Sequence, residues 1–187
     1  MIQVVPYDPK WMDTFSSIKQ RIWPALSSVA VGIEHVGSTS VPGLYAKPVV
    51  DVAVVVDSKQ ASDNAVKILE SLGYQHRGDL GIKDREAFKR PEDSPRHNLY
   101  VALQGSLSLR NHIALKQLML ERADLREKYS ALKHQLAVQF ADDIDRYCEG
   151  KTEFIVECLE QCGFSFHELN EIRRANNVPV RELQVRQ

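Results

Sequence analysis

The fold of this chain is decided by the stretch VAVGIEHVGSTSVPGLYAKPVVDVAVVV, which covers residues 29–56. Its two ends, 29–36 and 49–56, are short, apolar and rich in β-branched residues. That composition predicts two buried strands rather than helices. Between them, Gly37 to Ser40 is polar, and Pro42-Gly43 indicates a turn. The stretch therefore predicts a small polar loop that is held between two strands of one sheet.

Asp51 is the single charged residue of the second apolar run. A carboxylate in such a strand costs free energy unless a cation or several hydrogen-bond donors meet it. A Mg²⁺ ion that accompanies a bound phosphate could be that partner, because such sites commonly use one or two carboxylates. Lys47, four residues earlier, could instead form an ion pair with Asp51. The sequence leaves both interpretations open.

The loop Gly37-Ser38-Thr39-Ser40 offers hydroxyl and backbone N–H groups beside a turn that glycine permits. Groups of this kind can contact a phosphate. Alternatively, the loop is a polar turn whose side chains bond to their own backbone. If the loop binds a phosphorylated ligand, the cations Lys47 and Arg96 become further candidates for substrate binding.

The rest of the chain predicts an α+β fold: an N-terminal helix, a mixed sheet, and a helical C-terminal half. We expect one domain over 1–163, with its sheet core at about 29–104 and a helical extension over 105–163. The tail, 164–187, could form a final helix with an extended end, or pack on another copy of the chain in a homo-oligomer. The expected elements are helices over 9–26 and 58–72, strands over 74–77, 86–90 and 97–103, and helices between 107 and 159.

The composition narrows the class of protein. Among 187 residues, 24 Lys and Arg face 25 Asp and Glu, which gives a net charge of −1. This balance argues against broad, charge-driven binding of nucleic acid. No apolar run approaches the roughly 20 residues of a membrane helix, and the chain opens without a signal-peptide pattern. The three cysteines form no even disulfide framework. We therefore expect a cytoplasmic protein without membrane segments.

Several segments together resemble the GrpB family of the nucleotidyltransferase superfamily. The resemblance covers about residues 5 to 160, and its most specific part is the loop with Lys47-Pro48 and Asp51. It implies a nucleotidyltransferase-like sheet followed by a helical extension, with a Gly-Ser turn and a carboxylate that bind a nucleotide and Mg²⁺. The matching segments are 5–11, 34–44, 46–51, 95–101, 129–133 and 151–155.

The chain departs from the superfamily pattern at its carboxylates. The superfamily usually has a second carboxylate two residues after the first, where this chain has Ala53. A third carboxylate usually comes from a later strand, where this chain offers Arg96, His97 and Asn98. We therefore take Asp51 and His97 as the catalytic candidates. His35 is interpreted as a packed core residue.

A second metal ligand would have to come from elsewhere, and Glu34 is the candidate beside Asp51. If both carboxylates hold a metal ion, Glu34→Gln should weaken divalent-metal binding as Asp51→Asn does. Tyr129 and Lys133 are interpreted as exposed helix residues, and Arg85 as a solvated loop charge.

Two main functions follow. The chain could bind a nucleotide or other phosphorylated small molecule with Mg²⁺ and transfer a nucleotidyl or phosphoryl group. It could instead be a non-catalytic module that binds such ligands on the same fold and has lost the carboxylates for chemistry. A third possibility is that the helical half binds a protein partner.

Overall fold

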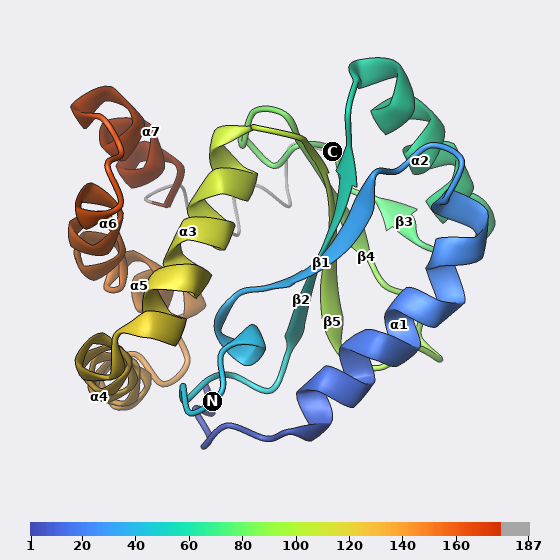
Figure 1. Ribbon diagram of the computed structural model, residues 1–187. Helices are drawn as coiled ribbons and strands as arrows, with labels where there is room; N and C mark the ends of the chain where they lie inside the picture. Colours follow the sequence, from blue (N-terminus) through green and yellow to red (C-terminus); the bar gives the residue numbers. More distant parts are fainter. Residues whose placement is uncertain (177–187) are drawn as a thin grey trace.

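A mixed sheet of five strands forms the centre of the computed structural model, which describes residues 1–176. The strands lie in the order β1-β2-β5-β4-β3 (Figure 1). β2 and β5 run parallel, and the other neighbouring pairs are antiparallel. The strands are β1 Gly32–Val36, β2 Val50–Val56, β3 Gln75–His76, β4 Arg85–Lys89 and β5 His97–Leu103.

One face of the sheet packs on α1 (Lys10–Leu26) and α2 (Lys59–Ser71). Because side chains alternate along a strand, Val52 and Val54 of β2 point to this face. They join Ile22 and Leu26 of α1 in the largest apolar cluster. This packing, together with the β-branched composition, explains why most of each predicted run is a strand, although β1 begins at Gly32 and not at residue 29.

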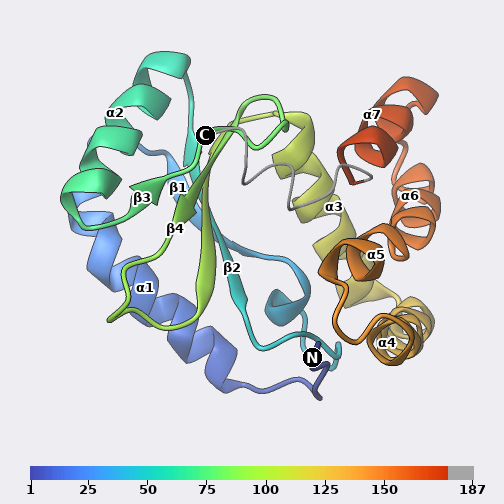
Figure 2. The ribbon, with the colours of Figure 1, turned by 180° about the vertical axis from the view of Figure 1, so that it is seen from behind.

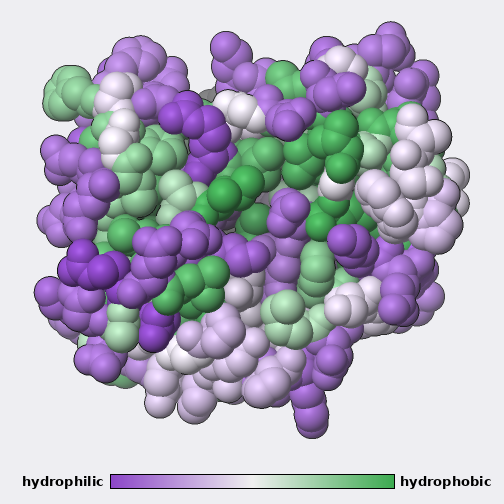
Figure 3. Space-filling model, in the orientation of Figure 1, coloured by the Kyte–Doolittle hydropathy of each residue, from purple (hydrophilic) through white to green (hydrophobic). Residues whose placement is uncertain are grey.

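The other face carries the helical half of the chain. Its helices are α3 (Leu107–Glu121), α4 (Ala123–Gln139), α5 (Ile144–Glu149), α6 (Thr152–Gln161) and α7 (Phe166–Asn176). Figures 1 and 2 show α3 between the sheet and the outer helices. On the face drawn in Figure 3, hydrophobic side chains gather along the middle and hydrophilic ones form the periphery. None of the helices within residues 1–176 has the length and apolar character that a membrane span requires.

The predicted fold class is confirmed, and β5 has the bounds that the alternation predicted. Pro24 lies inside α1, which ends two residues later at Leu26. Proline has no backbone N–H and cannot donate to the carbonyl four residues earlier, which agrees with the end of the helix soon after it. The predicted final helix is α7, whose Leu169 and Ile172 share an apolar cluster with α6 and with Phe164 of the preceding turn. The predicted extended end falls in 177–187, outside the described residues.

Candidate functional site

Asp51 and Asn98 are register partners on the parallel strands β2 and β5, each at the second position of its strand. Asn98 Nδ2 donates a hydrogen bond of 2.8 Å to Asp51 Oδ1. Asp51 is half-buried and Asn98 is exposed, so this pair lies at an open edge of the sheet.

Gly37 brings the polar loop against the Asp51 carboxylate. Its backbone has φ +70° and ψ −175°, a region that glycine alone adopts readily. A Cβ at this position would lie 2.4 Å from Asp51 Oδ2. The glycine therefore permits both the turn and the close approach. The turn continues as a single 3₁₀ turn, η1 (Ser38–Ser40), in which Ser40 Oγ donates to the Gly37 carbonyl.

Cations surround this carboxylate, yet its pKa is raised. Burial raises the pKa of Asp51, and the hydrogen bond from Asn98 and the charges of Lys47, Lys151 and Arg85 only partly offset that effect. No direct ion pair joins Lys47 to Asp51 among the described residues; the Lys47 amine lies 5.6 Å from the centre of the Tyr147 ring. The ion-pair alternative that the sequence left open is therefore not the arrangement observed.

Two lysines of the helical half reach the loop and Asp51. Lys133 Nζ donates to Ser38 Oγ over 3.2 Å and to the Tyr45 carbonyl, above the Tyr129 ring. Lys133 is only 2% exposed, and Tyr129 is 4% exposed. The interpretation of both as exposed helix residues was wrong. That interpretation took every face of α4 to be exposed to solvent, whereas one face of α4 packs against the loop.

Lys151 approaches from the turn between α5 and α6. Its amine lies 4.5 Å from the centre of the Tyr147 ring, the same ring that Lys47 approaches. Burial lowers the pKa of Lys151, and Asp51 works against that shift. Lys133 and Lys151 both fall in segments that resemble the GrpB family, and that resemblance was the signal that could have identified them.

Arg85 completes the cationic side of the site. Its guanidinium lies 4.6 Å from the centre of the Tyr100 ring, and its buried Nε has no hydrogen-bond partner among the described residues. Arg85 and Asp51 stand on the same sheet face, because Arg85 pairs with Ala102 and Asp51 pairs with Asn98. The interpretation of Arg85 as a solvated loop charge was therefore wrong.

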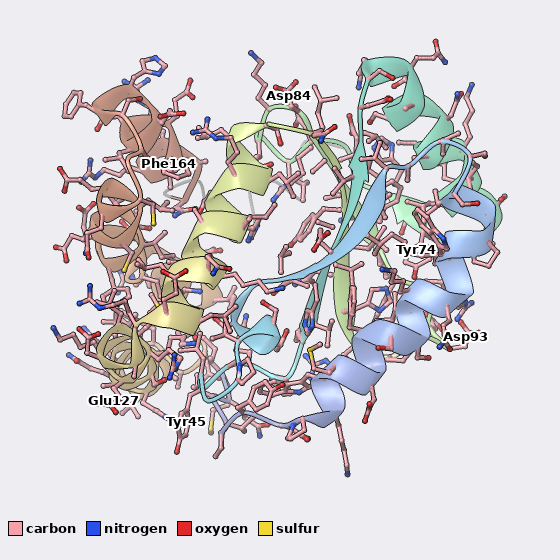
Figure 4. All side chains as sticks on the ribbon, in the orientation of Figure 1. Tyr45, Tyr74, Asp84, Asp93, Glu127 and Phe164 are labelled. Carbon is pink, nitrogen blue, oxygen red and sulfur yellow. The ribbon has the colours of Figure 1, made fainter. Side chains whose placement is uncertain are left out.

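The structure does not bring His97 to Asp51. His97 is the residue before Asn98, so its side chain points to the opposite face of the sheet. There it is 4% exposed and bonds to the Tyr74 hydroxyl (3.0 Å) and the Pro95 carbonyl (2.7 Å). Figure 4 shows Tyr74 on the α1 side of the sheet and Tyr45 near α4. A catalytic role for His97 together with Asp51 does not fit this placement.

Two other predicted residues lie at the margin of the site. Arg96 is exposed just before β5. Glu34 is exposed on β1 and pairs with Ala53, diagonally from Asp51. His35, by contrast, is the packed residue that the sequence indicated: it stacks on Phe15 and its Nε2 lies 3.0 Å from Thr39 Oγ1. Through this contact with Thr39, His35 helps to hold the loop in place.

A resident Mg²⁺ centre does not fit these residues. No group of three or more His, Cys, Asp and Glu residues that could hold a metal ion occurs within residues 1–176. Ala53 is packed among apolar side chains, and Asn98 turns its amide nitrogen, not its oxygen, toward Asp51. The nearby charges are cationic, so they would repel a free divalent ion. One carboxylate with three cations suits an anionic ligand better.

A separate hollow of about 440 Å³ lies on the outer surface of α1. It is lined by side chains of one helix, Ser16, Lys19, Gln20, Trp23 and Pro24. None of the site residues described above borders it. We therefore place the candidate site at the Asp51 cluster, where chemically distinct groups from both halves of the chain converge.

The model of the GrpB family, described as "GrpB protein", matches residues 1–161. The chain belongs to the GrpB family. The UPF0157 protein YqkA of Bacillus subtilis is 29% identical over 154 residues, which are 82% of this chain and 45% of YqkA. The chain thus spans less than half the length of that relative.

Solved structures agree with this assignment. The crystal structure of conserved protein GrpB from Enterococcus faecalis matches with a TM-score of 0.75 and 27% identity, over 87% of this chain and all of that one. The Cid1 poly(U) polymerase with bound MgGTP matches with a TM-score of 0.52 and 12% identity, over 72% of this chain and 44% of Cid1. This second similarity shows a nucleotidyltransferase-like fold.

Asp51→Asn is expected to raise the melting temperature of the ligand-free protein at pH 7. Because the folded-state pKa of Asp51 is raised, its contribution to stability is fully present below the unfolded pKa and is lost as the pH rises. The asparagine amide avoids that loss, because it does not ionise. Each kcal/mol gained in the free energy of unfolding raises the melting temperature by about 2–4 °C in a domain of this size. Thermal denaturation between pH 4 and pH 8 measures the effect, which should shrink toward pH 4.

The control for this variant is Asp57→Asn, at an exposed position just after β2. It should change the melting temperature little at any pH. If Asp51→Asn instead destabilised the protein at pH 7, the carboxylate would be a necessary counter-ion for the neighbouring lysines, and the site would be structural.

Proposed function

We propose that this protein binds a nucleotide or another phosphorylated small molecule at the loop Gly37–Ser40, without a resident metal ion. The observation that carries the proposal is the convergence of Lys47, Lys151 and Arg85 on a half-open site that contains one carboxylate. An excess of positive charge in a partly desolvated site favours a phosphate group.

The loop geometry supports the same ligand. Gly37 allows the backbone to approach the site closely, and Ser38 presents a half-buried hydroxyl there. Arg85 has a buried Nε–H without a partner among the described residues, and burying such a donor costs free energy until a ligand accepts from it. A phosphate oxygen is a suitable acceptor. Lys133 donates to the Ser38 hydroxyl from behind it and is not one of the cations assigned to the phosphate.

The second candidate function is Mg²⁺-dependent nucleotidyl or phosphoryl transfer, which the nucleotidyltransferase-like fold favours. Two-metal transfer depends on carboxylates that hold the metal ions. This chain has Ala53 and Asn98 at two of the expected positions, so Asp51 alone would have to hold an ion that arrives with the ligand. Similarity of fold does not by itself imply that two proteins catalyse the same reaction. Binding without transfer therefore agrees better with the residues present.

The test is a thermal-shift titration with ATP, ADP, AMP and tripolyphosphate, each with Mg²⁺ and with EDTA. A ligand that binds the native state raises the melting temperature by mass action. We expect stabilisation by one or more of these ligands, and we expect it to persist in EDTA. Stabilisation by tripolyphosphate alone would show that the phosphates, and not the nucleoside, are recognised.

Lys151→Met should weaken that binding by about 10- to 100-fold, because a hydrogen bond to a charged group contributes about 1.5–3 kcal/mol. Lys128→Met, an exposed position on α4, is the matched control and should bind as the wild type does. Pyrophosphate release that requires Mg²⁺ and Asp51 would favour transfer instead. No stabilisation by any of the four ligands would overturn the proposal.

A further inference from the structure

Ser38 and Lys133 form a hydrogen-bonded pair across the boundary between the sheet half and the helical half. Ser38 is half-buried on the loop, whereas Lys133 is 2% exposed on α4. The distance between Oγ and Nζ is 3.2 Å. The hydroxyl is thus the accessible member of the pair, and the amine lies behind it.

The contacts of Lys133 fix the direction of its amine. Lys133 Nζ donates one hydrogen to the Tyr45 carbonyl, and the same nitrogen lies 4.3 Å from the centre of the Tyr129 ring. A neutral amine has two hydrogens and one lone pair. With the Tyr45 carbonyl as acceptor, the lone pair of a neutral Lys133 can accept the Ser38 hydroxyl hydrogen.

The surroundings of Lys133 favour the neutral form. Burial, together with the positive charge of Lys151, lowers the pKa of Lys133 to about 7. The groups that face the amine from other elements are the Ser38 hydroxyl and the Tyr45 carbonyl, and its own helix adds the Tyr129 ring. None of these is a carboxylate that would stabilise the ammonium form.

We propose that Ser38 is a nucleophile, that Lys133 is its general base, and that the pair hydrolyses carboxylic esters of small molecules. This activity goes beyond the phosphate binding proposed above and does not depend on it. Serine nucleophiles with a lysine base are known variants of the serine–histidine arrangement. Within residues 1–176 the Ser38 N–H donates no hydrogen bond, so it can stabilise the oxyanion that forms.

The reaction balances with water as the co-reactant. Lys133 Nζ takes the proton of the Ser38 hydroxyl while Oγ attacks the carbonyl carbon of the ester. The carbon–oxygen bond to the alcohol then breaks, and the leaving alkoxide takes the proton from Lys133. Water attacks the acyl-Ser38, again through Lys133, which releases the carboxylic acid and restores the serine hydroxyl.

The test is labelling with an alkyl fluorophosphonate, followed by peptide mass spectrometry, alongside hydrolysis of p-nitrophenyl acetate. Labelling forms a phosphorus–oxygen bond at the serine and releases fluoride. We expect the label on Ser38, and a labelling rate that rises with pH and levels off above about pH 7, where Lys133 is neutral. An unlabelled wild-type protein, or a label on another residue, would overturn the proposal.

Variants separate the general base from a structural lysine. Lys133→Met and Lys133→Arg should both slow labelling by about 10²- to 10⁴-fold, because general-base catalysis contributes that much and arginine stays protonated. Ser38→Ala should abolish labelling. Lys128→Met and Ser71→Ala, at exposed positions, are the matched controls.

Circular dichroism shows whether each variant is folded, and the same proteins are tested with tripolyphosphate. Wild-type labelling rates in a folded Lys133→Arg protein would make the lysine a structural tether and overturn the assignment. Because phosphate binding rests on Lys47, Lys151 and Arg85, it should persist in both Lys133 variants if they are folded. Loss of labelling with retained binding, or the reverse, therefore tells the two proposals apart.

Discussion

Gly37→Ala is expected to lower the melting temperature by about 6–12 °C, which corresponds to about 3 kcal/mol in a domain of this size. Two costs add. The new Cβ would lie 2.4 Å from Asp51 Oδ2 and 3.0 Å from Asp51 Cγ, and overpacking of this kind costs about 1–3 kcal/mol. The backbone at φ +70° and ψ −175° adds about 1–3 kcal/mol for any residue with a Cβ.

The two costs can be measured separately by denaturant unfolding of a double-mutant cycle. Asp51→Ala in the Gly37→Ala background should recover most of the steric part, since only the contact with the Cβ of residue 51 at 3.1 Å remains, and leave the backbone part. Gly32→Ala, in the same strand region, is the control, because a Cβ there would meet no heavy atom within 4 Å. Additivity of Gly37→Ala and Asp51→Ala would contradict the close approach of the loop to the carboxylate.

The stability of the protein is also expected to fall in mild acid, and His35 should be a large contributor. Burial, with a smaller effect of Lys116, lowers the pKa of His35 to about 4 from 6.5. The unfolded chain therefore binds a proton between these values that the folded chain does not. The contribution is fully present above pH 6.5 and is lost as the pH falls toward 4.

Between pH 7 and pH 4.5 this loss should reach about 2–3 kcal/mol, since one unit of pKa corresponds to 1.36 kcal/mol. Urea unfolding of the wild type and of His35→Gln at both pH values measures it. The variant should lose less stability in acid, because glutamine does not titrate. His167→Gln, at an exposed position on α7, should keep the wild-type dependence. An equal loss in His35→Gln and the wild type would show that other groups, such as His97 and His112, carry the effect.

The loss of stability in acid should also affect the candidate functional site, because His35 contacts its loop. Its ring contacts Thr39 in η1, and its carbonyl accepts from Lys116 of α3 over 2.8 Å. Protonation of His35 would place a charge in a packed site beside Phe15 and loosen the contact of His35 with the loop. We therefore expect ligand binding and stability to weaken together in acid.

The sequence alone predicted the strands and the polar turn between them, because those depend on local patterns. Alternation and β-branched residues indicated β2 and β5, and the glycine before three small polar residues indicated a turn that could bind phosphate. Asp51 was identified because a lone carboxylate among valines must have polar partners. The motif resemblance then indicated the family, which the family model confirms.

Only the tertiary structure decided which charges meet Asp51. Arg85 of β4 and Lys151 of the α5–α6 turn lie far from Asp51 in the sequence, and composition and periodicity alone do not distinguish them from solvated cations. Conversely, His97 and Asn98 are neighbours in sequence, but strand alternation places them on opposite faces of the sheet. Local patterns fix the direction in which each side chain leaves its own strand or helix. The packing of α4 and the α5–α6 turn against the loop decides which side chains then come within interaction distance.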